Sequence, residues 1–252
     1  MTIFEHDRVS THDGSVAEPA PSNKALVDLL NAGEPYAVIF GGQGGTWLEG
    51  LEELVNMAGI ESELSAIVGE AELLLEPIAR ELVVVRPIGF EPLSWVRALA
   101  AGDPVPSQSQ LTSSAISGPG ILLTQMAAVR ALTRQGLDLA ATPPVAIAGH
   151  SQGVVAVESF RAGGARDAEL LAMGQLIGAA GSLVSRRRGM VGRGDKSPML
   201  SVTNADPDRI AELLHDFSQD VRTVQAPVLS IRNGRRSVVI TGTPEQLNRF
   251  EL

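Results

Sequence analysis

Hydrophobic residues in most of the first 190 positions recur at intervals of three and four, the spacing of a helix with one apolar face. The segments with this spacing are predicted to be helices: 22–33, 47–58, 61–80, 92–102, 120–136, 152–164 and 167–189. Two short apolar runs, "PYAVIF" at 35–40 and "PPVAIAGHS" at 143–151, lack the helical spacing and are predicted to be strands. The pattern therefore predicts an α/β protein with many helices.

The hydrophobic pattern changes from mainly helix-like to partly strand-like near residue 199. Strand-like runs begin at 198, 226 and 236, and the last two flank the turn "NGRR". A helix is predicted from Asp206, because aspartate is a favoured N-cap and Pro207 follows at the first helical position. A further helix begins at Pro244, so the order is β-α-β-β-α. This order matches most of a ferredoxin-like βαββαβ unit, without its last strand.

Three segments follow from these patterns. Residues 1–21 are polar and rich in turn-forming residues, and are expected to be a flexible arm. Residues 22–198 are expected to form an α/β core, and 199–252 an incomplete ferredoxin-like subdomain. Because the chain stops within an apolar helix, we expect it to be a fragment of a longer protein.

Composition narrows the classes of function. The 252 residues carry 20 Lys and Arg against 29 Asp and Glu, a formal net charge of −9, which argues against nucleic acid as a partner. No cysteine is present, so disulfides and thiol chemistry are excluded, and no metal site is expected. The N-terminus has no apolar signal segment, and no uninterrupted apolar run is long enough to span a membrane. We expect a soluble, cytoplasmic protein with no membrane partner.

The most specific local motif is "GHSQG", residues 149–153, which matches G-x-S-x-G. In that motif the glycines allow a tight turn from a strand into a helix and expose the serine hydroxyl. The N-terminus of the following helix favours the developing oxyanion. Ser151 is therefore a candidate nucleophile, and an inert glycine-rich turn is the alternative.

A nucleophilic serine needs a base, and the chain offers four histidines: His6, His12, His150 and His215. The first two lie in the predicted arm. His150 is adjacent to Ser151, but neighbouring side chains at such a turn point away from each other, so a packing role is favoured. His215 is expected on the polar face of a helix, so none of the four is a convincing base.

A second glycine-rich segment, "FGGQGG", follows the first predicted strand at 40–45. It lacks the spacing of G-x-G-x-x-G and the Lys-Ser/Thr of a phosphate-binding loop, so a nucleotide site is disfavoured. Gln43 could donate its side-chain amide or fix the backbone near the serine.

Taken together, "VIFGGQGG" and "AGHSQG" resemble the motifs of the acyl-carrier-protein acyltransferases of fatty acid and polyketide synthesis, over residues 35–252. The form "GHSQG" and the segment "ITGTPEQL" are most similar to the N-terminal acetyltransferase region of type I fatty acid synthases, mycobacterial-type and fungal. The resemblance implies an α/β-hydrolase-like acyltransferase core with an inserted ferredoxin-like subdomain, here truncated. It also implies that Ser151 carries the acyl group, while the Gln152 N–H and the loop around Gln43 hold the oxyanion. The positions implied to line the substrate pocket are Gly42, Gly44, His150, Ile177 and Asn233.

Two departures from the family pattern bear on substrate and activity. Malonyl-specific members carry an arginine that pairs with the malonyl carboxylate, and Ile177 occupies that position. A buried isoleucine would disfavour a carboxylate and favour acetyl, although Arg186–Arg188 would reverse this if the alignment is shifted. The family's catalytic histidine follows the ferredoxin-like insert, so it is expected beyond Leu252, and the fragment alone is expected to be inactive.

The resemblance thus implies transfer of an acetyl starter group from acetyl-CoA, through acyl-Ser151, to the phosphopantetheine thiol of an acyl carrier protein. No permanently bound cofactor is expected. Expected partners are the carrier protein and other domains of the same synthase, in a homo-oligomeric parent chain, and the CoA phosphates could meet Arg186–Arg188. The alternatives are a serine esterase or thioesterase using His215 with Asp195 or Asp206, a malonyl-specific transacylase, and a non-catalytic assembly domain.

Overall fold

A computed structural model describes residues 23–43, 46–188, 198–220 and 227–251. The chain forms two compact units, residues 1–180 and 181–252. The division falls inside one long helix, α8 (Asp167–Arg187), and so precedes the change in hydrophobic pattern near residue 199. The predicted arm, 1–21, lies outside the described residues.

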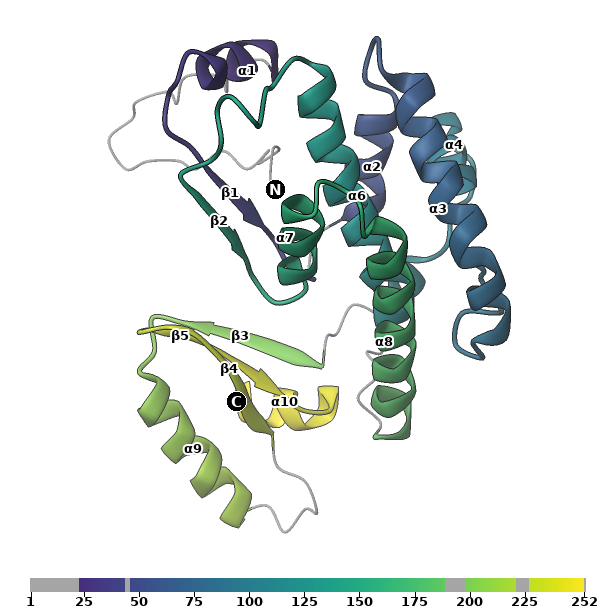
Figure 1. Ribbon diagram of the computed structural model, residues 1–252. Helices are drawn as coiled ribbons and strands as arrows, with labels where there is room; N and C mark the ends of the chain where they lie inside the picture. Colours follow the sequence, from purple (N-terminus) through teal and green to yellow (C-terminus); the bar gives the residue numbers. More distant parts are fainter. Residues whose placement is uncertain (1–22, 44–45, 189–197, 221–226, 252) are drawn as a thin grey trace. The chain divides into compact units, whose positions relative to one another are not determined.

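The first unit contains every helix and strand that the hydrophobic pattern predicts for it (Figure 1). Its elements are α1 (Asn23–Asn31), β1 (Ala37–Phe40), α2 (Trp47–Val55), α3 (Glu61–Glu81), α4 (Pro92–Ala101), α5 (Gln108–Leu111), α6 (Ser114–Arg134), β2 (Ala146–Gly149), α7 (Gly153–Arg161) and the first part of α8. The short helix α5 was not predicted. It begins at a capping box formed by Ser107 and Gln110, and it is too short to show a period.

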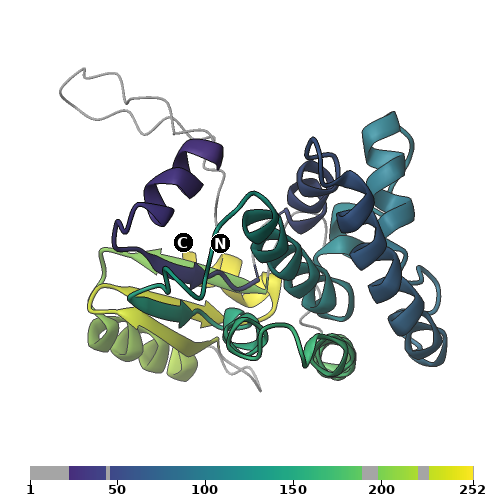
Figure 2. The same ribbon diagram turned by 45° about the horizontal axis from the view of Figure 1, so that its top comes forward.

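The two strands of the first unit pair in parallel, from Ala37 opposite Ala146 to Phe40 opposite Gly149. Figures 1 and 2 show α7 beside this pair of strands. Because parallel strands end at the same edge, the loop after Phe40 and the turn after Gly149 emerge side by side. The two glycine-rich motifs are thereby brought to one place.

Helix α6 is the central core helix of the first unit, and fifteen of its 21 residues are buried. It begins at Ser114, six positions before the predicted start, and it continues through Pro119. The predicted helix left out the segment "SGP" before Gly120. The structure shows why small residues are needed there: a Cβ at Gly120 would lie 2.6 Å from the Trp47 ring, and one at Gly118 3.1 Å from the Gly174 carbonyl oxygen.

Two helices, α6 and α8, have the length and mean hydropathy of a membrane span, 1.2 and 1.3 respectively. The sequence analysis had found no uninterrupted apolar run of that length. For α6 the apolar window is 83% buried inside the protein, as expected for a core helix, whereas for α8 it is 28% buried. Helix α8 begins at Asp167 and ends at Arg186 and Arg187, the charge order that also suits a helix in water.

The second unit has the predicted β-α-β-β-α order: β3 (Met199–Thr203), α9 (Pro207–Asp220), β4 (Val228–Gly234), β5 (Ser237–Thr241) and α10 (Pro244–Glu251). Strand β5 lies between β3 and β4 and is antiparallel to both. Helix α9 begins as predicted, because the carboxylate of Asp206 accepts a hydrogen bond from the Asp208 N–H at 2.9 Å.

The second unit has its own small hydrophobic core, formed by the buried residues Ile210, Leu214, Val238, Ile240 and Leu247. Phe217 of α9 and Phe250 of α10 meet edge to face, with ring centroids 5.8 Å apart. Both helices therefore pack on the same face of the three-stranded sheet.

Candidate active site

Ser151 lies in the turn between β2 and α7, and its backbone is in the left-handed region, at φ 53°. Among the described residues only one other non-glycine residue, Asn204, has a positive φ. For a residue with a Cβ this conformation costs about 1–2 kcal/mol, and serine has little intrinsic preference for it. Contacts elsewhere in the fold must therefore hold Ser151 in place.

Those contacts require the two glycines of the motif. A Cβ at Gly149 would lie 2.5 Å from the Gly153 carbonyl oxygen, and a Cβ at Gly153 would lie 2.1 Å from the Phe40 carbonyl oxygen. Helix α7 therefore begins directly against the end of β1. The G-x-S-x-G spacing here produces the sharp strand-to-helix turn that it predicts.

The loop after β1 touches this turn. A Cβ at Gly42 would lie 2.9 Å from the Cβ of Ser151 and 2.8 Å from the His150 carbonyl oxygen. The His150 N–H also donates to the Phe40 carbonyl oxygen at 2.9 Å. The structure thus brings together Gly42, Gln43, His150, Ser151 and Gln152, five of the eight residues that the sequence analysis assigns to the site.

The sequence analysis assigns the oxyanion to the Gln152 N–H and the loop around Gln43, and the N–H groups of both residues lie in this cluster. Within residues 23–43 and 46–188, the N–H groups of Gln43 and Gln152 donate to no backbone carbonyl. Gln152 is also the N-cap of α7, so its N–H lies at the positive end of that helix. A negatively charged oxygen bonded to Ser151 would be stabilised by such donors.

Helix α6 fixes both loops through side-chain amides. Gln43 Nε2 donates to Ser117 Oγ at 2.7 Å, Gln125 Nε2 donates to the Gly41 carbonyl oxygen at 2.8 Å, and Gln152 Nε2 donates to the Gly118 carbonyl oxygen. The sequence analysis missed Ser117 and Gln125. Both are buried polar residues of α6, but only Gln125 lies within the predicted helix, and the sequence carried no signal for Ser117.

Neither histidine in the described part of the chain is a hydrogen-bond partner of the serine. The Ser151 hydroxyl forms no hydrogen bond to another residue in the described part of the chain. His150 is exposed, and its Nδ1 faces the Gly42 position at 3.5 Å. His215 is exposed on α9, in the second unit, and Asp206 caps that helix. The Ser–Asp–His set of the esterase alternative therefore does not lie within one unit; His6, His12 and Asp195 are outside the described residues.

Of the three remaining predicted site residues, only Ile177 is placed differently from the expectation. Ile177, on α8, was expected to be buried, but 63% of it is exposed. The expectation took an apolar side chain as a buried pocket wall, whereas Met173, Leu176 and Ile177 of α8 are all exposed. Asn233 lies on β4, in the second unit. Gly44 lies outside the described residues.

No group of three or more acidic, histidine or cysteine side chains gathers as a metal site in the described parts of the chain. The described chemistry of the site is therefore a hydroxyl, two backbone N–H groups and amide side chains that hold the loops. This set can accept and stabilise an acyl group on oxygen.

Comparison with known proteins gives a consistent fold. A family model described as the fatty acid synthase central AT domain matches residues 198–252. The acyltransferase domain from module 8 of the salinomycin polyketide synthase aligns over 85% of this chain and 41% of its own, with 19% identity and a TM-score of 0.53. MCAT from Streptococcus pneumoniae aligns over 86% and 57%, with 19% identity and a TM-score of 0.51.

A third similar structure was solved as a complex of a malonyl-transacylase, PlMCAT, with its type II polyketide synthase acyl carrier protein, AntF. It aligns over 86% of this chain and 58% of that chain, with 18% identity and a TM-score of 0.51. The chain therefore has the α/β fold of the malonyl-CoA:ACP transacylase type of acyltransferase. It spans between 41% and 58% of the length of these three structures.

Proposed function

We propose that this chain is part of an acyltransferase that moves an acyl group from an acyl-CoA to the phosphopantetheine thiol of an acyl carrier protein, through an ester on Ser151. The observation that carries the proposal is the conformation of Ser151. It is held at φ 53° by close backbone approaches on both sides, with Gly42 against its Cβ. The transacylase-type fold is consistent with this chemistry.

The reaction would proceed in two half-reactions at one site. Ser151 Oγ loses its proton to a base and attacks the thioester carbonyl carbon, and the Gln43 and Gln152 N–H groups receive the oxyanion. The carbon–sulfur bond then breaks, and CoA leaves as a thiol after taking up a proton. In the second half-reaction the carrier thiol attacks the serine ester, and the serine hydroxyl recovers its proton.

The proposal assigns the base to no described histidine. Without a positioned base, hydroxide has to remove the serine proton, so this chain should be nearly inactive near neutral pH, in line with the sequence analysis, and acylation of Ser151 should become faster at higher pH. A base that pairs with Ser151 would remove this dependence above its own pKa. The pH dependence of acylation therefore reports whether a positioned base acts on Ser151.

Within this activity we propose an acetyl group as the donor in preference to malonyl, as the starter step of a type I fatty acid synthase. The support is the residue at position 177, where an isoleucine stands in place of an arginine that could pair with a carboxylate. The exposure of Ile177 removes the further argument from burial. Malonyl transfer is the competing hypothesis, and the labelling experiment below distinguishes it from acetyl transfer.

The proposal also covers the cofactor, the cellular location and the partners of the protein. It assigns no permanently bound cofactor, because CoA and the phosphopantetheine arm enter as substrates. It places the chain in the cytoplasm, beside the carrier protein and other domains of a homo-oligomeric synthase. Co-purification of an acyl carrier protein with the parent protein, and its size in solution, would test these points.

Intact-mass spectrometry after incubation with acetyl-CoA or malonyl-CoA, from pH 7 to pH 9, tests the proposed function. The chain should gain one acetyl group, more of it at higher pH, and less malonyl than acetyl. Ser151→Ala should gain none, while Ser185→Ala, a partly exposed serine on α8, should behave as the unchanged chain.

Equal labelling of Ser151→Ala and the unchanged chain would contradict the assignment of Ser151 as the nucleophile. Equal or greater malonyl labelling would contradict the acetyl preference alone. Rapid release of the acyl group to water, without a carrier protein, would support the esterase alternative instead.

A further inference from the structure

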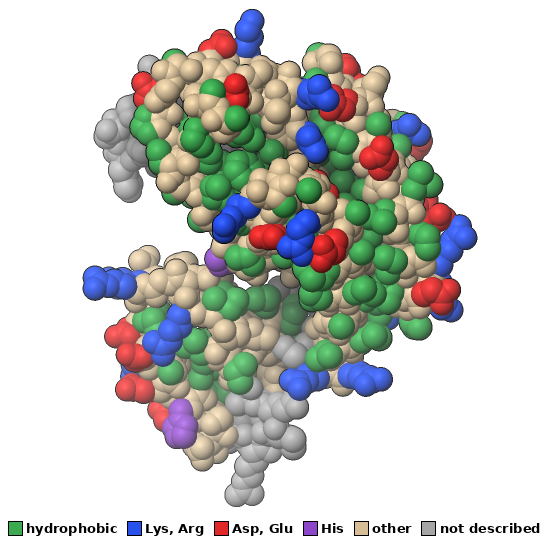
Figure 3. All heavy atoms as spheres, in the orientation of Figure 1, with side chains coloured by type: hydrophobic (Ala, Val, Ile, Leu, Met, Phe, Trp, Pro, Cys, Tyr) green, Lys and Arg blue, Asp and Glu red, His purple; other side chains and the backbone are tan. Residues whose placement is uncertain are grey.

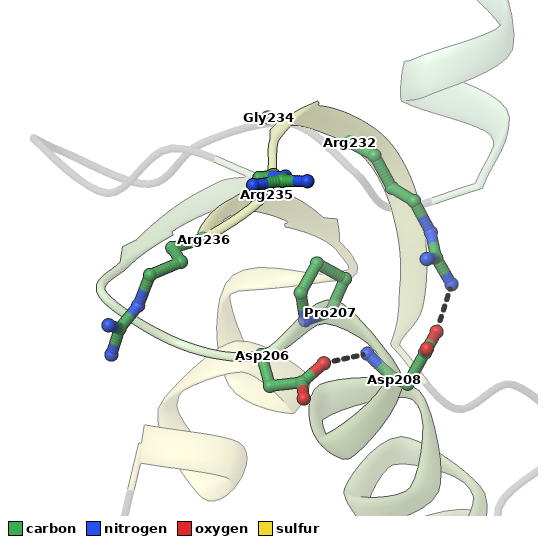
Figure 4. A pocket seen from close by; sticks show the side chains of 7 residues that line it. All are labelled: Asp206, Pro207, Asp208, Arg232, Gly234, Arg235 and Arg236. Carbon is green, nitrogen blue, oxygen red and sulfur yellow. Dashed lines mark hydrogen bonds and ion pairs between the residues drawn. The ribbon is translucent and has the colours of Figure 1, made fainter.

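The second unit has an open hollow of about 580 Å³ beside the β4–β5 turn (Figure 4). Three of the residues that line it are arginines, and two are aspartates. The full lining is Asp206, Pro207, Asp208, Arg232, Gly234, Arg235 and Arg236. Every lining residue belongs to the second unit, so the hollow is complete without the first unit.

Local structure places the arginines around the start of α9. Gly234 pairs with Ser237, so Arg235 and Arg236 are the two residues of a tight hairpin turn. Figure 4 shows Arg232 and Arg236 on opposite sides of Pro207, with Arg235 between them. The hairpin and the first turn of α9 therefore form the walls of the hollow.

The two carboxylates in the hollow already have partners. Asp206 accepts from the Asp208 N–H at 2.9 Å as the cap of α9. Asp208 pairs with Arg232 at 3.0 Å, but its side chain is 82% exposed and that of Arg232 is 53% exposed. An ion pair this exposed contributes little and can be exchanged for a better one.

The other two guanidinium groups have no carboxylate partner among the described residues. Arg236 Nη2 donates to the neutral carbonyl oxygen of Asn204 at 3.2 Å, and Arg235 makes no hydrogen bond or ion pair within them. Three arginines and two aspartates give the hollow a formal net charge of +1, on a chain of net charge −9. A local excess of positive charge attracts anions.

We propose that this hollow binds the phosphate groups of the acyl-CoA donor. The guanidinium fork matches phosphate oxygens in two parallel hydrogen bonds, and arginine is weakly hydrated for a cation. The volume lies in the range of small-molecule sites. The inference rests on the proposed function for the identity of the ligand. Arg186–Arg188, which the sequence analysis also expects to meet the CoA phosphates, do not line this hollow, so their contact with CoA stays a separate prediction.

Calorimetric titration of the full chain tests the proposal with four probes: CoA, adenosine 3′,5′-bisphosphate, inorganic phosphate and pantetheine. CoA and the bisphosphate should bind, and pantetheine, which has no phosphate, should bind much more weakly. The double variant Arg235→Gln/Arg236→Gln should weaken CoA and bisphosphate binding about tenfold or more. Arg235→Lys/Arg236→Lys should retain part of the affinity, because the charge remains and the fork is lost.

A matched control is Arg209→Gln on α9, which removes one positive charge from the same unit but breaks only the Arg209–Glu212 pair. It should leave CoA affinity nearly unchanged. Equal CoA affinity for the double variant and the unchanged chain would overturn the proposal, as would equal binding of CoA and pantetheine. Inorganic phosphate binding as tightly as the bisphosphate would reduce the site to an adventitious ion only.

Ser151→Ala separates this proposal from the proposed function. If it keeps full CoA affinity and that affinity depends on the arginines, the hollow is a CoA site whatever Ser151 does. If Ser151 is acylated by acetyl-CoA but the CoA affinity does not depend on Arg235 and Arg236, the proposed function is supported and the proposal for the hollow is wrong.

Discussion

The two compact units each contain a turn from a strand into a helix that passes through a left-handed residue. In the first unit the residue is Ser151, between β2 and α7, and in the second it is Asn204, between β3 and α9. Asparagine is several-fold enriched in this conformation, because its short side chain can hydrogen-bond locally. Serine has no such advantage, so the first turn is the strained one.

The two turns are also held by different kinds of contact. After Asn204 the neighbouring Asp206 caps α9, so local chemistry accounts for the turn. At Ser151 the constraint comes from far along the chain, because Gly153 abuts Phe40 and Gly42 abuts Ser151. A strained residue that persists only through tertiary contacts is typical of a functional position.

The largest effect on this comparison is expected from Gly153→Ala. The new Cβ would lie 2.1 Å from a backbone oxygen of Phe40, and neither backbone can move without separating α7 from β1. We expect a loss of more than about 3 kcal/mol in the free energy of unfolding, measured by urea denaturation. The control Gly181→Ala, on α8, meets nothing within 4 Å and should stabilise by up to about 1 kcal/mol. Near-equal stability of the two variants would contradict the explanation that the close approach of Gly153 to Phe40 requires a glycine.

Glycine substitution at the two left-handed residues compares their strain directly. Ser151→Gly should raise the free energy of unfolding by about 1 kcal/mol relative to Ser151→Ala, because glycine reaches positive φ without steric cost. Asn204→Gly should change it by less than about 0.5 kcal/mol relative to the unchanged chain. Thermal and urea unfolding measure the free energy of unfolding of each variant. A larger gain in this free energy from glycine at Asn204 than at Ser151 would reverse the comparison.

The smallest effect concerns the cap of the second turn. Asp206→Ala should cost about 1 kcal/mol, because the Asp208 N–H loses its acceptor. Asp208→Ala breaks only the exposed pair with Arg232 and should cost less than about 0.5 kcal/mol. If Asp208→Ala proved the more damaging variant, the turn would depend on the ion pair and not on the cap.

Local signals made much of the fold predictable. The periodic helices, the two strands of the first unit and the Asp206–Pro207 start of α9 all follow from residues near each other in sequence. The early start of α6 could not be predicted, since Pro119 and its flanking glycines signal a break unless their close packing partners are known. The anchoring role of Gln125 likewise depends on Gly41, far away in the chain.

The wrong expectation for Ile177 has a similar cause. Helices α6 and α8 have equal length and similar hydropathy, yet α6 is the core and α8 is mostly exposed. Figure 3 shows hydrophobic side chains over α8 in that view. An apolar period predicts a face that could be buried, but only the fold determines whether another element covers it.

The most direct test of the central claim, that Ser151 accepts the acyl group, is peptide mapping by mass spectrometry after incubation of the full chain with acetyl-CoA at pH 9. The account predicts a single acetyl group, on the peptide that contains Ser151, and none in Ser151→Ala. Acetylation of another residue, with Ser151 unmodified, would contradict it.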